Sequence, residues 1–171
     1  LTKPLSLPAI RLLPFAPTRG QLLIMEQIER DMEKGEPMNR LVQGDVGSGK
    51  TVLALYAMYI AVQNGYQAAL MAPTEILAQQ HFTAVSRIFG ADAALLKGGM
   101  KKSERDNTYG RIASGEAKAV VGTHALITDA LSFSRLGLVV ADEQHRFGVR
   151  QRAAIGAKGE QTDVLIMSAT P

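Results

Sequence analysis

Short apolar runs alternate with helical stretches along most of the chain. Residues 1–20 are rich in proline and show no period, so we expect an extended N-terminal lead-in there. In 21–34, apolar residues recur at helical spacing among charged ones, which predicts an amphipathic helix. Further helices are predicted over 50–63 and from about Thr74 onward. The apolar runs predict strands at 41–43, 68–72, 93–96, 119–121, 138–141 and 164–167.

The predicted strands are apolar at consecutive positions rather than at alternate ones. Strands of this kind are buried on both faces, as in a parallel sheet that is covered by helices on each side. The alternation of strand and helix therefore predicts an α/β fold with a mostly parallel sheet. We expect residues 21–171 to form one domain, because a chain of 171 residues is long enough to bury one core.

Composition excludes some kinds of site and of protein but does not indicate a function. The chain has 46% hydrophobic and 20% charged residues, as is typical of globular proteins, and no cysteine, which excludes disulfides and thiolate metal sites. We expect a reducing, cytoplasmic location, and the most apolar helical run, 52–62, is too short to cross a membrane. The net charge of +3 is too mild to indicate nucleic acid. Basic residues gather over 97–118, where charge alone favours a solvated helix face.

A glycine-rich loop follows the first predicted strand. The pattern G-x-x-x-x-G-K-[ST] is matched in full by Gly44, Asp45, Val46, Gly47, Ser48, Gly49, Lys50 and Thr51. Glycines let successive backbone N–H groups point at phosphate oxygens, and the following helix adds its positive dipole end. Lys50 supplies a cation to the β- and γ-phosphates, and the Thr51 hydroxyl is a hard ligand for Mg²⁺. The loop predicts binding of a nucleoside triphosphate.

Two adjacent carboxylates follow the strand predicted at 138–141. Ligands sit at the carboxyl ends of parallel strands, so Asp142 and Glu143 are expected at the edge that holds the phosphate loop. We assign Asp142 to Mg²⁺, through water, and Glu143 to orienting and deprotonating the attacking water. An ordinary acidic strand end is the simpler interpretation, but beside a complete phosphate loop the pair favours hydrolysis, with Glu143, Asp142 and Lys50 as the catalytic residues.

The string Asp-Glu-Gln-His-Arg-Phe-Gly-Val at 142–149 contains a D-E-x-H box and resembles the RecG branch of the superfamily 2 helicases. The phosphate loop, with 37–41 before it, is similar to the same branch. The resemblance spans 14–171 and keeps several motifs in order and spacing. It implies a RecA-like P-loop domain, with helices on both faces of the sheet, that is the first motor domain of an ATP-dependent DNA helicase.

The resemblance also implies roles for residues near the nucleotide. Phe15, Thr18 and Gln21 would recognise adenine, although the residues alone fit a hydrophobic staple and an exposed amide equally well. A second group would couple hydrolysis to movement on DNA: Gln144, His145, Ser168 and Thr170.

A further group would contact DNA: Pro73, Thr74, Gln79, Lys97, Gly98, Gly99, Gly122, Thr123, His124, Arg146 and Phe147. The local sequence is compatible with this role at Thr74, because Thr74 can cap a helix whose first N–H groups could receive a phosphate. Relatives often have Thr-Gly-Ser where this chain has Lys97-Gly98-Gly99, so Lys97 and the Gly99 N–H would replace a hydroxyl. Phe147 fits stacking on bases and packing in a core equally well.

Taken with the resemblance, the motifs predict an ATP- and Mg²⁺-dependent motor domain that remodels branched DNA, such as replication forks and Holliday junctions, in recombination and repair. The expected partners are DNA, a second RecA-like motor domain and a wedge domain, with no membrane. Because the chain begins at Leu1 and ends just after a strand, we expect a fragment with weak or no activity of its own. The alternatives are a transcription-repair coupling translocase, which Gln144 and Ser48 disfavour, and a nucleotide-binding switch module without motor activity.

Overall fold

The computed structural model describes residues 19–33, 39–44, 48–123, 126, 131–142 and 162–169. In this part of the chain the helices are α2 (Arg19–Glu33), α3 (Ser48–Gln63), α4 (Glu75–Phe89), the 3₁₀ helix η1 (Gly90–Asp92) and α5 (Lys102–Ser114). The strands are β1 (Asn39–Gly44), β2 (Gln67–Met71), β3 (Ala93–Leu96), β4 (Ala119–Gly122), β5 (Leu136–Asp142) and β6 (Asp163–Ala169). Every strand expected from the apolar runs is present.

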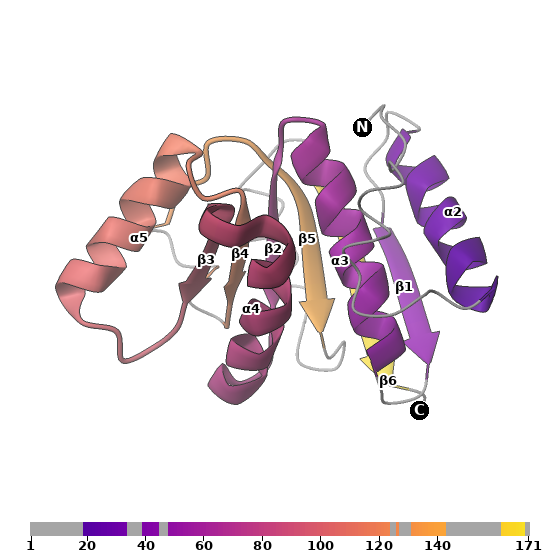
Figure 1. Ribbon diagram of the computed structural model, residues 1–171, viewed down its shortest axis with the longest axis horizontal. Helices are drawn as coiled ribbons and strands as arrows, with labels where there is room; N and C mark the ends of the chain where they lie inside the picture. Colours follow the sequence, from indigo (N-terminus) through magenta and orange to yellow (C-terminus); the bar gives the residue numbers. More distant parts are fainter. Residues whose placement is uncertain are drawn as a thin grey trace.

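The six described strands form one parallel sheet in the order β1-β6-β5-β2-β4-β3 (Figure 1). Because the strands are parallel, their carboxyl ends all lie at one edge, which we call the carboxyl edge. The predicted α/β fold with a parallel sheet is confirmed. Within the described ranges, no helix is both long enough and apolar enough to span a bilayer.

Side chains of β2 alternate between two hydrophobic cores. Ala68 and Leu70 pack in the core that α2, α3 and α4 cover, whereas Ala69 and Met71 pack in the core that holds Ile112 of α5. All five β2 residues are buried. Burial on both faces explains why this strand is apolar at every position but its first, and it confirms the expectation of a sheet covered on both sides.

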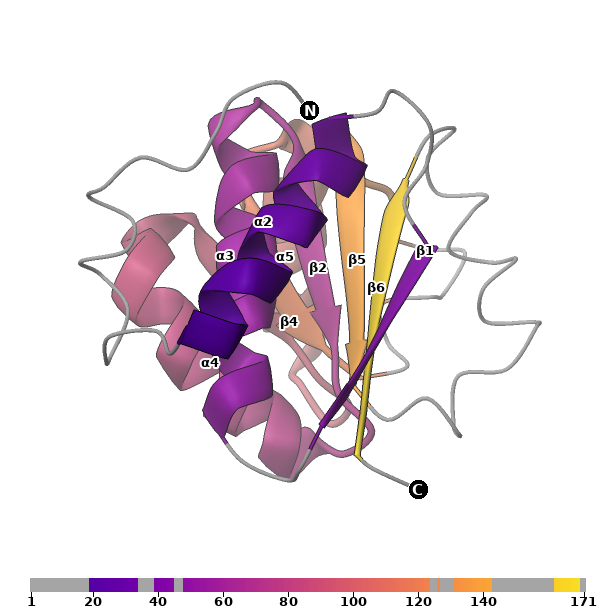
Figure 2. The ribbon, with the colours of Figure 1, turned by 90° about the vertical axis from the view of Figure 1, so that its right-hand side faces the viewer.

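Helix α3 is apolar around most of its circumference because it packs against both the sheet and α2. Residues 52–58 are all buried, and the two views of the ribbon show α2 beside α3 on the same side of the sheet (Figures 1 and 2). Helix α2 contributes Met25, Ile28 and Met32, at helical spacing, to the same core. The apolar stripe predicted for this segment is therefore buried in the core on this side of the sheet, mainly against α3.

The first helix begins at Arg19 rather than at the predicted Gln21, and residues 1–18 of the lead-in expected over 1–20 lie outside the described residues. Gly20 is then the second residue of α2. The N–H groups of a first helical turn have no acceptor within the helix, and glycine is most costly in a helix interior, so the helix tolerates glycine at this position. Helix α3 likewise begins at Ser48 rather than at Lys50.

Candidate functional site

The glycine-rich loop lies between a strand end and a helix start. Gly44 is the last residue of β1, and Ser48 is the first residue of α3. Lys50 and Thr51 follow in the first turn of α3, and Thr51 is partly buried. A helix N-terminus at the end of a parallel strand presents backbone N–H groups and the positive end of the helix dipole, which is the arrangement that binds phosphate.

Strand β6 lies between β1 and β5 and aligns their carboxyl ends. Gly44 pairs with Ala169, and Asp142 pairs with Met167. Neighbouring strands lie about 4.8 Å apart, so β1 and β5 are separated by about 10 Å. The start of the phosphate loop, the backbone of Ser168 and the backbone of Asp142 therefore share one short stretch of the carboxyl edge. We call this stretch, formed by β1, β6 and β5, the nucleotide half.

Some predicted site residues lie outside the residues that the structure describes. On the nucleotide side these are Phe15, Asp45, Val46, Gly47, Glu143, Gln144, His145 and Thr170. Among the expected DNA contacts they are His124, Arg146 and Phe147. Gln21 lies in the first turn of α2, and Gly49 lies in the first turn of α3. Their assigned roles stay predictions.

Strands β2, β4 and β3 form the rest of the carboxyl edge, which we call the backbone half. Strand β4 aligns its neighbours, because Gly122 pairs with Met71 of β2 and with Leu96 of β3. The N–H of Ala72 donates a 2.8 Å hydrogen bond to the carbonyl of Gly122. The segments that follow these strands are therefore adjacent: Pro73 and Thr74, Thr123, and Lys97 to Gly99. The structure thus brings together most of the described residues that were expected to contact DNA.

Thr74 caps helix α4, as predicted. Its backbone is extended, with φ −135° and ψ 159°, and its Oγ1 accepts a 3.2 Å hydrogen bond from the N–H of Leu77. The carbonyl of Thr74 accepts the N–H of Ala78 at 3.0 Å, which starts the helix. Gln79 is exposed in the following turn. The cap fixes the start of α4, so that its first N–H groups face the carboxyl edge.

A tight turn follows β3. The N–H of Lys97 contacts the sulfur of Met100 at 3.5 Å, and Gly99 has a left-handed φ of 75°. Glycine adopts this conformation without steric cost. Gly98 and Gly99 are exposed, while Lys97 is partly buried. The turn therefore presents backbone to solvent beside the start of α4, in place of the hydroxyl side chains of Thr-Gly-Ser.

Gly122 is required by packing at the end of β4. A Cβ at this position would lie 2.5 Å from the carbonyl oxygen of Leu96 and 2.9 Å from Cγ of Leu126. Real Cβ atoms do not approach neighbours this closely. The absence of a side chain lets β3 and β4 reach the carboxyl edge together, so Gly122 shapes the backbone half whether or not it contacts DNA.

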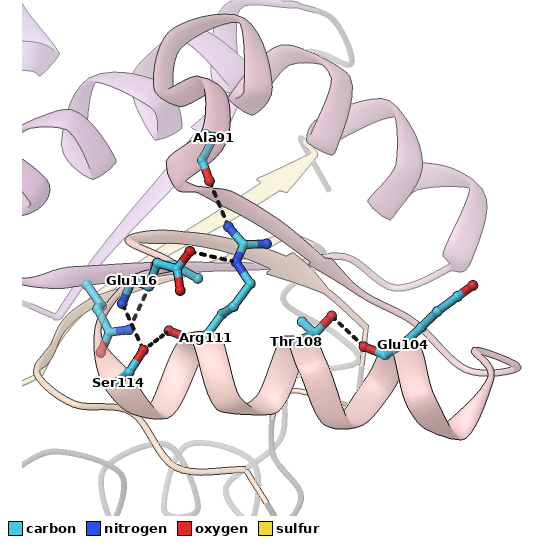
Figure 3. A network of polar contacts seen from close by, with 8 residues as sticks. Ala91, Glu104, Thr108, Arg111, Ser114 and Glu116 are labelled. Atoms are coloured by element: carbon cyan, nitrogen blue, oxygen red, sulfur yellow. Dashed lines mark hydrogen bonds and ion pairs between the residues drawn. The ribbon is translucent and has the colours of Figure 1, made fainter.

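The basic stretch over 97–118 has two parts. The guanidinium of Arg111 donates to the carbonyl of Ala91 at 2.7 Å and lies 3.7 Å from the carboxylate of Glu116 (Figure 3). Arg111 therefore joins the end of α5 to η1, which is a structural role. Lys101 and Lys102, at the start of α5, are exposed. The interpretation of the whole stretch as one solvated face is thus wrong at Arg111, because that side chain bridges two elements.

Sequence reasoning overlooked Glu75 at the edge of the backbone half. Glu75 is the first residue of α4, and its carboxylate lies against Gly98. An acidic residue in the first turn of a helix is common because the helix dipole favours it, so the residue type alone does not indicate a site.

The sequence of this chain is similar to those of known helicases. The model of the family described as DEAD/DEAH box helicase matches residues 18–171. The ATP-dependent DNA helicase RecG of Streptococcus pneumoniae is 54% identical over 160 residues, which is 93% of this chain and 24% of the relative. RecG of Aquifex aeolicus is 46% identical over 168 residues, covering 95% of this chain and 21% of the relative. The resemblance to RecG helicases expected from the motifs is confirmed, and the chain spans about a quarter of these relatives.

Solved structures agree with the observed fold. A structure described as RecG bound to a three-way DNA junction superposes with a TM-score of 0.81 and 42% identity, over 96% of this chain and 22% of that one. The helicase domain of Pyrococcus furiosus Hef superposes with a TM-score of 0.68 over 90% of this chain and 32% of that one. At 24% identity, the second match shows the fold alone. Both matches are consistent with a RecA-like α/β domain.

Proposed function

Because the chain belongs to the DEAD/DEAH box helicase family, we propose that it is the ATP-hydrolysing first motor domain of a translocase that remodels branched DNA. The observation that carries the proposal is the alignment at the carboxyl edge. Gly44, which begins the predicted phosphate loop, and Asp142 are the last residues of β1 and β5, while the capped start of α4 and the glycine turn follow β2 and β3 in the same sheet. A motor domain needs a nucleotide-binding site and a DNA-binding site on the same folded unit.

The nucleotide half fits ATP with Mg²⁺. Among the residues that the structure describes, no group of three or more His, Cys, Asp or Glu side chains could hold a metal by itself. Magnesium in nucleotide sites takes one or two protein ligands and the phosphate oxygens, so Thr51 and Asp142 form a sufficient protein set. When bound, Mg²⁺ supplies charge neutralisation at the β- and γ-phosphates. Lys50 would hold the same phosphates, and Glu143 would accept the proton of the attacking water.

The coupling group links the two halves in the proposed mechanism. Ser168 lies near the carboxyl end of β6, between the strands that end at Gly44 and Asp142. In the sequence, Gln144 and His145 follow the last residue of β5 closely, and Thr170 directly follows the last residue of β6. We assign to them the hydrogen bonds that change when the γ-phosphate is lost.

The backbone half fits the phosphates of a nucleic-acid strand. Its donors would be the first N–H groups of α4 and the N–H groups of Gly98 and Gly99, with Lys97 as the cation and Thr123 as a hydroxyl. Backbone N–H groups read phosphate rather than base, so the contacts are independent of sequence. This property suits a domain that moves along DNA.

Branched DNA and the remaining domains are part of the proposal. The RecG relative whose structure superposes here was solved with a three-way DNA junction. This chain spans about a quarter of such relatives, so a second motor domain and a wedge domain that engages the junction would lie elsewhere in a longer protein. Phe147 and Arg146 would then lie beside the DNA at the end of the D-E-x-H string.

The test is ATP hydrolysis by the full-length protein that carries this domain, with forked DNA, linear duplex and RNA compared. We expect strong stimulation by forked DNA, and we expect Glu143→Gln to abolish turnover while ATP binding is retained. Lys50→Ala should abolish both binding and turnover, and Gln63→Ala, on the exposed end of α3, should change neither. Equal rates with every nucleic acid would contradict the branched-DNA substrate, and unchanged function in Glu143→Gln would contradict the motor role.

A further inference from the structure

The loops that follow β3 and β4 each lead into an apolar residue, and both of these residues pack in the same core. Met100 comes directly after the turn at 97–99, and its partly buried side chain packs against the core that holds Ile112. Leu126 comes three residues after Thr123 and is itself a member of that core, with only 3% of its surface exposed. Two neighbouring loops of the backbone half are therefore attached to one hydrophobic core.

Each of the two apolar residues also contacts the start of its own loop. The sulfur of Met100 accepts the N–H of Lys97 at 3.5 Å, and the N–H of Leu126 donates to the carbonyl of Thr123 at 3.1 Å. Both contacts join residues that are three apart in the sequence, so each holds the start of a loop close to the packed residue. A thioether is a weak acceptor, so packing contributes more than the sulfur contact at Met100.

Gly122 leaves the room that the side chain of Leu126 occupies. A Cβ on Gly122 would lie 2.9 Å from Cγ and 3.0 Å from Cδ2 of Leu126. The last residue of β4 therefore lies against Leu126 on one side, and it pairs with Leu96 of β3 on the other. Paired strands lie about 4.8 Å apart, so the loops after β3 and β4 begin side by side at a fixed spacing.

The turn after β3 is held at both ends while its middle is open to solvent. Leu96 before the turn is buried, Met100 after it packs in the core, and Gly98 and Gly99 between them are exposed. Glycine loses more conformational freedom than any other residue when its backbone is ordered. Attachment at both ends reduces the freedom that two successive glycines would lose when they bind a ligand.

We propose that Met100 and Leu126 are positioning residues for DNA, which hold the loops after β3 and β4 at the spacing at which both reach one strand. They act through the loops and not by contact with the strand. The inference rests on the proposed function, because it takes the backbone half as the site for DNA. Without either residue, the loop that it holds would have to be ordered each time DNA binds, which weakens binding. The nucleotide half contains neither residue, so hydrolysis itself is unaffected.

The experiment measures ATP hydrolysis by the full-length protein that carries this domain, over a range of forked-DNA concentrations. Met100→Ala and Leu126→Ala should each raise the DNA concentration for half-maximal stimulation by about three- to tenfold, with the maximal rate and the rate without DNA unchanged. Met100→Leu keeps an apolar side chain of similar size and should restore most of the loss. Ile112→Ala truncates the same core near the opposite edge of the sheet, so it should lower thermal stability and leave the half-maximal concentration unchanged.

Three results would overturn the inference: an unchanged half-maximal concentration in Met100→Ala, a value in Met100→Leu as high as in Met100→Ala, or an equal rise in Ile112→Ala, which would reflect lost stability alone. Met100 is only partly buried, so its variants carry the test if Leu126→Ala does not fold. The unsubstituted protein separates this failure from failure of the proposed function. Absence of stimulation by any DNA in that protein removes both proposals, whereas stimulation there with unchanged variants removes this one alone.

Discussion

The side-chain oxygen of Gln67 accepts a 2.9 Å hydrogen bond from the N–H of Arg135, which fixes the start of β2 beside the start of β5. The amide nitrogen of the same side chain donates to the carbonyls of Ile112 and Ala117, at 2.9 and 2.8 Å. Gln67 is 3% exposed. One buried amide therefore joins two strands to the end of α5, at the edge of the sheet opposite the candidate sites.

Gln67→Ala should lower the free energy of unfolding by about 3 kcal/mol, because it removes the three hydrogen bonds of a buried amide, each contributing about 1 kcal/mol. Urea unfolding followed by circular dichroism measures this change. Gln63→Ala, which removes an exposed amide from the end of α3, is the matched control and should change stability by less than about 0.5 kcal/mol. Equal effects of the two substitutions would mean that the buried amide contributes nothing specific.

Gly122→Ala should destabilise the fold by about 1–3 kcal/mol, because its Cβ would overlap the carbonyl oxygen of Leu96 and the side chain of Leu126. Gly110→Ala is the control within the same chain. A Cβ on Gly110, inside α5, would meet no atom within 4 Å, so this change should stabilise the protein by about 0.5–1 kcal/mol. Thermal unfolding of both variants gives the two signs, and a stable Gly122→Ala protein would refute the packing argument.

Thr74→Ala should cost about 1 kcal/mol of stability, the typical contribution of a helix N-cap. Thr74→Ser keeps the hydroxyl that accepts the N–H of Leu77 and should retain most of that stability. Hydrogen exchange of the first-turn amides of α4 would localise the effect. If Thr74→Ala and Thr74→Ser were equally destabilised, the methyl group rather than the hydroxyl would be the stabilising feature.

The isolated 171-residue chain should bind ATP weakly and hydrolyse it slowly, with little stimulation by DNA. The physical reason is that a second motor domain would supply an arginine finger, which contributes about 10³- to 10⁵-fold in rate. Steady-state phosphate release with and without duplex DNA measures this. Robust DNA-stimulated turnover by the isolated chain would show that it needs no partner domain for catalysis.

Much of the fold could be predicted from local pattern. Strand β3 was expected at 93–96 and is observed there, because its apolar residues are bounded by Asp92 on one side and Lys97 on the other. Strand β5 was expected to start at Leu138 but begins at Leu136 and includes Gly137. Glycine normally disfavours a strand, and it is placed here by the tertiary structure, since a Cβ on it would lie 2.6 Å from Cβ of Tyr66.

The candidate site was predicted in its parts but not in its arrangement. A parallel sheet requires the ends of β1 and β5 to lie at one edge, so the approach of Gly44 and Asp142 was expected. The insertion of β6 between them depends on long-range strand pairing, which leaves no local signal. The contact of Glu75 with Gly98 joins segments that are far apart in the sequence, and neither residue indicates the other.

Strand β5 of the nucleotide half pairs directly with β2 of the backbone half. Asp142 pairs with Met167 on one side, and Ala141 pairs with Met71, just before the segment that caps α4, on the other. In the proposed motor, the two sites would therefore be joined directly by the backbone hydrogen bonds between β5 and β2, across one strand spacing of about 4.8 Å. Substitutions that weaken the pairing of β5 with β2 should uncouple ATP hydrolysis from translocation on DNA while leaving each binding site intact.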